Sequence, residues 1–290
     1  MIEALTQPLN YEFFRHGLIA ATLAGALCGL MGVYIVLRRM SYIGHGLSHA
    51  VFGGAVVSAL MGWNFFLGAG AWGFLSALLI QRTAQRRNIG ADAAIGVITT
   101  ASFALGVALI SKSRSFEKNF ESALFGNILG VTPEDLIAIG VVSAVIALAV
   151  FFGYKQLLFA TFDPEIAPVY GVPTRWVDAA FALALAATIV VCMNVVGVTL
   201  IAAAIVIPPV SARLLTHAFG PLVLLSTLLG AACGFFGMFV SFYADVASGP
   251  AIILLAAGGF GIVYLLTGLR SSSRAGHPHP GGHELAPDLH

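Results

Sequence analysis

The feature that most constrains the fold is a series of long apolar segments that recurs along almost the whole chain. Each approaches the roughly 20 residues that an α-helix needs to cross the hydrocarbon core of a bilayer. With 59% hydrophobic and only 9% charged residues, the chain has too little polar surface to cover a soluble globule. The sequence therefore predicts an all-α polytopic membrane protein with eight or nine transmembrane helices. The predicted spans are 17–37, 45–62, 65–80, 92–111, 133–153, 176–195, 198–215, 221–243 and 250–268.

Lysine and arginine are distributed unevenly between these segments, which predicts the orientation of the chain. Most of them fall in one set of loops, and the positive-inside rule places that set in the cytoplasm. Residues 1–16 then form an extracytoplasmic N-terminal segment, and residues 17–268 form the transmembrane domain. Residues 269–290 are rich in Ser, Gly, Pro and His without apolar periodicity, so we expect a disordered cytoplasmic tail.

Charge and motif content exclude two broad classes of function. The formal net charge is +1, so no basic footprint argues for nucleic-acid binding. No glycine-rich phosphate-binding loop of the Walker type occurs. We therefore expect no enzyme, and any energy for transport must come from a partner subunit or an ion gradient.

Two histidines, His45 and His49, lie four residues apart at the start of an apolar segment. On a helix this spacing places both imidazoles on one face, where they offer two nitrogens to one cation. Zinc prefers imidazole nitrogen, whereas manganese suits carboxylate and mixed oxygen ligands. A proton relay or interhelical hydrogen bonds are the alternatives. The pattern predicts a metal contact.

Other polar residues and prolines at membrane depth also indicate function, because they are costly there. A proline pair removes backbone donors and is expected to break its helix, and a broken helix at depth is tolerated where it lines a cavity or is packed in protein. Asp245 is either a turn residue or part of an entrance. Asp178, near the start of its helix, is expected to cap it. The candidates for a pathway or gate are Ser48, Asn194, Pro208, Pro209 and Asp245.

Three connections differ from plain loops. The outer stretch 112–132 alternates charged and apolar residues, as an interfacial amphipathic helix does. The inner stretch 155–175 predicts a short helix outside the bilayer, which is either a solvated connector or a docking helix for a cytoplasmic partner. In the tail, a flexible run of histidines either binds zinc loosely or is incidental. These tail residues are His277, His279, His283 and His290.

Four motifs occur in order along the chain, at 40–50 (Met-Ser-Tyr-Ile-Gly-His-Gly-Leu-Ser-His-Ala), 94–97 (Ala-Ile-Gly-Val), 162–172 and 197–209. Together they resemble the membrane subunits of ATP-binding-cassette importers for zinc and manganese, and the similarity extends from about residue 15 to residue 268. The resemblance implies a permease in the bacterial inner membrane that pairs with a second copy or a close relative. It also implies a cytoplasmic ATP-binding subunit and an extracytoplasmic metal-binding protein as partners.

The resemblance further implies roles for individual residues. Ser48 and His49 match the family's Ser-His pair, whose histidine meets the ion in the translocation path. His45 departs from the family pattern, since many members have aspartate there, and exchanging anionic oxygen for neutral nitrogen shifts the preference toward zinc. Phe162, Asp163, Pro164 and Glu165 match a stretch near the ATPase-coupling region, which favours docking for 155–175.

These observations lead to the hypothesis of a zinc-importer permease that binds no permanent cofactor. The alternatives are a manganese or iron importer permease of the same family, or a proton-coupled secondary metal transporter.

Overall fold

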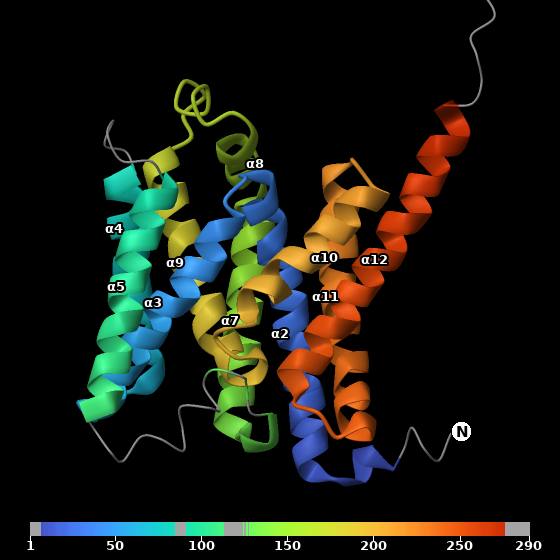
Figure 1. The fold of residues 1–290 in the computed structure, drawn as a ribbon. Helices are drawn as coiled ribbons and strands as arrows, with labels where there is room; N and C mark the ends of the chain where they lie inside the picture. Colours follow the sequence, from blue (N-terminus) through green and yellow to red (C-terminus); the bar gives the residue numbers. More distant parts are fainter. Residues whose placement is uncertain (1–6, 85–90, 113–123, 125, 127, 276–290) are drawn as a thin grey trace, which may run out of the picture.

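The computed structural model describes residues 7–84, 91–112, 124, 126 and 128–275, and within this part of the chain every regular element is a helix (Figure 1). The prediction of an all-α membrane protein is confirmed. The α-helices are α2 (Glu12–Leu37), α3 (Ser41–Leu60), α4 (Phe65–Ala84), α5 (Ala91–Lys112), α7 (Pro133–Phe152), α8 (Tyr154–Phe162), α9 (Thr174–Val196), α10 (Ile201–Leu215), α11 (Phe219–Ala244) and α12 (Ser248–Ala275). Two short 3-10 helices are η1 (Pro8–Asn10) and η3 (Ile128–Gly130).

Eight of the described helices are long and apolar enough to cross a membrane. The apolar helix α10 is shorter, with 15 residues, and at 1.5 Å per residue it rises about 22 Å. In Figure 1, α2 begins at the lower end of the bundle and α12 ends at the upper end. Opposite ends require an odd number of passes, so the eight long spans and α10 together make nine passes in the described part of the chain.

Helices α2 and α11 form a backbone-to-backbone contact at the centre of the fold. A Cβ atom added to Gly25 would overlap the carbonyl oxygen of Gly230, and one added to Gly230 would overlap the carbonyl oxygen of Gly25. The Ser226 hydroxyl donates a 2.6 Å hydrogen bond across the same contact to the carbonyl oxygen of Gly29. Small residues therefore serve here to bring two helices close together, as they commonly do in membranes.

The prediction that Pro208 and Pro209 break their helix is wrong. Helix α10 continues through both residues. Pro209 has no N–H to donate to the carbonyl of Ile205, but that carbonyl lies against Gly32 of α2, where an added Cβ would overlap it. Helix α2 therefore packs directly on the freed carbonyl and covers it with protein, an environment in which a proline inside a membrane helix is tolerated.

The interruption lies instead between α9 and α10, at residues 197–200. Gly197 has a φ of 90°, a conformation that glycine adopts without steric cost. Thr199 anchors the interruption, because its backbone N–H and its Oγ1 both donate to the carbonyl oxygen of Leu124, at 3.3 and 2.8 Å. Val198 is buried. Irregular backbone at this depth is tolerated because protein packs around it.

We expect Thr199→Val to lower the free energy of unfolding by about 1 kcal/mol, the usual net contribution of one hydrogen bond. Thr188→Val is the matched control, since the Thr188 hydroxyl bonds only to the carbonyl of Ala184 within its own helix, at 2.8 Å. The measurement is denaturant unfolding of the purified protein in detergent. Equal stabilities of the two variants would show that the Leu124 contact contributes nothing.

Candidate functional site

The start of α3 is positioned by a tight connection from α2. Arg39 adopts a left-handed conformation, with φ 55°. The backbone N–H of Arg39 donates to the carbonyl of Val36 at 3.1 Å, and that of Met40 donates to the carbonyl of Ile35 at 2.9 Å. This pair of bonds is the Schellman motif that ends many helices. It lets α3 begin immediately, so His45 falls in the first turns of α3, at the end of the bundle where α2 ends.

The two histidines of α3 lie side by side, as their spacing predicts. The ring centroids of His45 and His49 are 4.7 Å apart, and the rings are nearly perpendicular, at 88°. Two imidazoles that share one tetrahedral ion at a metal–nitrogen distance of about 2.1 Å have centroids about 5 Å apart. His45 is exposed and His49 is half-buried. The pair is thus close enough to contact one ion at the surface of the subunit.

Helix α5 packs behind this pair and holds one of its rings. Gly46 allows close approach, because a Cβ added there would lie only 2.5 Å from a side-chain carbon of Ile95. Phe103 then reaches His49, with ring centroids 4.7 Å apart in an edge-to-face arrangement. Phe103 was not predicted from the sequence, because nothing distinguishes it from other aromatic residues in apolar segments.

The described part of the chain places few metal-binding side chains beside the histidine pair. Among the described residues there is no group of three or more His, Cys, Asp or Glu side chains that could hold a metal ion. Ser48 is buried, and its hydroxyl donates to the carbonyl oxygen of His45 at 2.7 Å, within the same helix. Any further His, Cys, Asp or Glu ligand to an ion at His45 and His49 would therefore come from outside the described part of the chain.

Three further pathway candidates, Asn194, Pro208 and Pro209, lie on α9 and α10. The Asn194 amide donates to Asp135 at 3.3 Å, and Asp135 forms the capping box at the start of α7 with Thr132. Asn194 therefore ties the end of α9 to the start of α7. Pro208 and Pro209 are buried in α10, and Pro209 faces α2.

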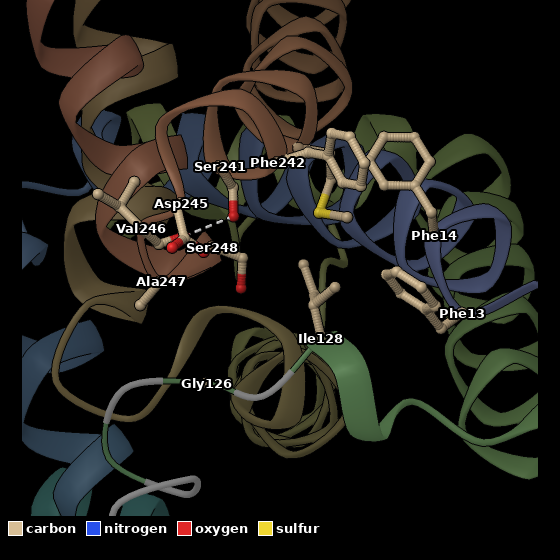
Figure 2. A pocket seen from close by; sticks show the side chains of 11 residues that line it. Phe13, Phe14, Gly126, Ile128, Ser241, Phe242, Asp245, Val246, Ala247 and Ser248 are labelled. Atoms are coloured by element: carbon tan, nitrogen blue, oxygen red, sulfur yellow. Dashed lines mark hydrogen bonds between the residues drawn. The ribbon is translucent and has the colours of Figure 1, made fainter. Parts of the chain in front are cut away.

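Asp245 lies in the turn between α11 and α12, at the lower end of the bundle in Figure 1. It has a left-handed conformation, with φ 52°, and beside it the Ser241 hydroxyl donates to the carbonyl of Val246 at 2.7 Å. The same turn borders a cavity of about 400 Å³. Figure 2 shows Ser248 on one side of this cavity and Phe14 on the other. Asp245 is thus a turn residue that also lines an opening at this end of the bundle.

The inner stretch 155–175 contains the short helix that the sequence predicts. Helix α8 ends at Phe162, and a series of turns follows before α9 begins. The Asp163 carboxylate accepts from the backbone N–H of Ile166 at 3.3 Å. Val169 and Tyr170 are strongly exposed, at 83% and 71%. We call five exposed apolar side chains between the end of α8 and the first turn of α9 the loop patch. Its members are Phe162, Ile166, Val169, Tyr170 and Trp176.

Two other predictions can be compared with the structure. Asp178 does not cap α9, which begins at Thr174. Its carboxylate instead pairs with Arg38 at 2.8 Å. Most of the stretch 112–132 and the tail residues His277, His279, His283 and His290 lie outside the described residues.

Comparisons with known proteins agree with this architecture. A family model described as the ABC 3 transport family matches residues 10–267. The manganese transport system membrane protein MntC of Halalkalibacterium halodurans is 35% identical over 262 residues, which cover 90% of this chain and 89% of that protein. A probable iron transport system membrane protein of Haemophilus influenzae is 33% identical over 270 residues, 93% of this chain and 99% of that protein.

A solved structure shares the fold. The structure described as PsaBC from Streptococcus pneumoniae in complex with Fab matches with a TM-score of 0.84 and 34% sequence identity, over 91% of this chain and 95% of that one. These comparisons confirm the resemblance to permeases of ATP-binding-cassette metal importers that the motifs indicated. They also confirm a multi-pass protein of the bacterial inner membrane. The chain belongs to the ABC 3 transport family.

Proposed function

We propose that this chain is the permease subunit of an ATP-binding-cassette importer for a divalent transition metal. The observation that carries the proposal is the pair of imidazoles, His45 and His49, on an otherwise apolar helix with their rings 4.7 Å apart. A transport site must bind an ion weakly enough to release it, which an incomplete set of ligands allows. Membership of the ABC 3 transport family supports an ATP-driven importer over a proton-coupled secondary transporter. ATP hydrolysis then takes place in a separate subunit.

We further propose that two copies of the chain enclose the path. His45 is exposed on its own subunit, and a second copy facing it supplies another pair of nitrogens to the same ion. The ion reaches this site from an extracytoplasmic metal-binding protein. That protein docks at the end of the bundle where Asp245 borders the cavity of about 400 Å³.

The loop patch is the proposed contact with the cytoplasmic ATP-binding subunit. Val169 and Tyr170 lie outside the membrane-spanning helices and yet expose most of their apolar surface. An apolar patch exposed to water typically marks a protein contact. Phe162, a member of this patch, ends α8, and Asp163, Pro164 and Glu165 follow it directly, which supports their role in coupling.

Two metals are supported by different observations. Zinc is favoured by ligand chemistry, because both side chains at the site are imidazoles. Manganese is favoured by the relatives, since several that are 34 to 36% identical are named manganese transport proteins. We propose zinc as the transported ion because of the imidazole at His45, and manganese is the second candidate.

The test is ATP-dependent metal uptake into vesicles that contain the permease with its ATP-binding subunit and its metal-loaded binding protein. We expect the wild type to take up zinc faster than manganese. His45→Asp should lower the ratio of zinc to manganese uptake by about tenfold, because a carboxylate oxygen suits manganese better than imidazole does.

His217→Ala is the control, because His217 is exposed in the connection between α10 and α11. An unchanged ratio in His45→Asp would remove His45 as the selectivity residue. Wild-type uptake that needs no ATP would overturn the importer proposal itself.

A further inference from the structure

Arg38, at the end of α2, joins three helices near the inner end of the bundle. Its Nη1 lies 2.8 Å from Oδ1 of Asp178 on α9, and its Nε donates to Oγ1 of Thr161 on α8 at 3.2 Å. The guanidinium also lies over the ring of Phe181, 4.6 Å from its centroid. The Arg38 side chain is only 9% exposed. One side chain thus contacts α8 and α9 while its backbone ends α2.

This arrangement requires the shape of arginine. The planar guanidinium donates from two different nitrogens in fixed directions and stacks on an aromatic face, whereas a lysine ammonium is a single point charge. Here the two nitrogens reach different helices, Nε reaching α8 and Nη1 reaching α9. A lysine at this position would keep the charge opposite Asp178 and lose the link to Thr161.

We call Arg38 and its contacts with Asp178, Thr161 and Phe181 the junction. The junction lies between the proposed coupling stretch and the proposed metal site. Thr161 directly precedes Phe162, the first residue of the proposed coupling stretch. On the other side, the tight Arg39–Met40 connection leads straight into α3, which carries His45 and His49. Arg38 therefore connects α8 to the end of α2, which leads directly into α3.

Two buried polar groups at the junction form no hydrogen bond with the described residues. Nη2 of Arg38 is buried without a hydrogen-bond partner among the described residues, and the same holds for the hydroxyl of Tyr34, one turn earlier on α2. A buried donor without a partner costs about 1–3 kcal/mol. Within the described residues, these two side chains therefore do not use all of their hydrogen-bonding groups.

We propose that Arg38 is a positioning residue for transport, which links the movement of α8 under the ATP-binding subunit to the histidine-bearing helix α3. This inference rests on the proposed importer function. Stability alone accounts poorly for the arrangement, since the Asp178 side chain is 35% exposed and an ion pair that reaches solvent contributes little net stability.

The test compares ATP hydrolysis by the complex of permease and ATP-binding subunit with and without zinc-loaded or manganese-loaded binding protein. The variants are Thr161→Val, which removes only the α8 link, and Asp178→Asn, which keeps the shape but removes the charge on α9. Thr188→Val is the control for the hydroxyl, because Thr188 bonds within its own helix. Asp92→Asn is the control for the carboxylate, because Asp92 is exposed in the first turn of α5.

We expect Thr161→Val and Asp178→Asn to lower the ratio of stimulated to basal hydrolysis by about fivefold or more, the range typical of coupling between sites. Basal hydrolysis and assembly should stay as in the wild type, and both controls should keep the full ratio. A purely structural role would lower basal and stimulated hydrolysis in parallel, together with the melting temperature, and would overturn the inference. An unchanged ratio in both variants would overturn it as well. If even the wild type shows no stimulation by loaded binding protein, the importer proposal itself fails.

Discussion

Replacing His49 by alanine is expected to reduce ATP-dependent metal uptake by on the order of 100-fold, the upper range for losing a group that supports metal binding. His49 is the half-buried member of the pair, and its ring is held against Phe103, with centroids 4.7 Å apart. Without it, the remaining imidazole of His45 is exposed and has no second nitrogen beside it. The measurement is uptake of zinc and of manganese by vesicles with the reconstituted complex.

The same experiment contains its own controls. His217→Ala removes an exposed imidazole far along the chain and should leave uptake unchanged. Basal ATP hydrolysis by the His49→Ala complex should also stay normal, because this residue is not part of the loop patch. Uptake by His49→Ala at the level of His217→Ala would contradict the site assignment and leave the family membership intact.

Gly230→Leu is expected to prevent folding or to destabilise the protein by about 3 kcal/mol or more, at the upper end of the usual cost of overpacking. Even the first carbon of the new side chain would overlap the carbonyl oxygen of Gly25 on α2. Because the obstacle is backbone, it cannot move aside as a flexible side chain does. The amount of monodisperse protein after extraction and its melting temperature in detergent measure the effect.

Gly259→Leu on α12 is the matched control. No atom lies within 4 Å of a Cβ added at Gly259, and the residue is exposed on a membrane-spanning helix. The same leucine should therefore be tolerated there. Equal yields and melting temperatures of the two variants would show that α2 and α11 can separate without loss of the fold.

Much of the fold is predictable from the sequence because hydrophobic length is a strong signal in a membrane protein. Helix α2 begins earlier than predicted, at Glu12, and α12 ends later, at Ala275, because hydropathy does not register helical turns that extend beyond the bilayer. The error at Pro208 and Pro209 has a tertiary cause. The carbonyl of Ile205 is covered by Gly32 of α2, and this contact between two helices cannot be read from the sequence of α10 alone.

Only those contacts of the candidate site that lie within one helix were predictable from the sequence. The separation of His45 and His49 predicts their contact, since both lie on one helix. Phe103 and the pairing of Arg38 with Asp178 join residues on different helices, and no pattern within a single segment encodes them. The position of Asp178 near the start of α9 predicts a helix cap, because its partner Arg38 lies far away in the sequence, at the end of α2.

The short helix α10 has a consequence for how the protein is held in its membrane. With 15 residues, α10 falls short of the roughly 20 residues that let a segment partition into lipid alone. Its neighbours α2, α11 and α12 supply the surfaces against which it is buried. We therefore expect α10 to stay in the membrane through its contacts with these neighbours and not through its own length.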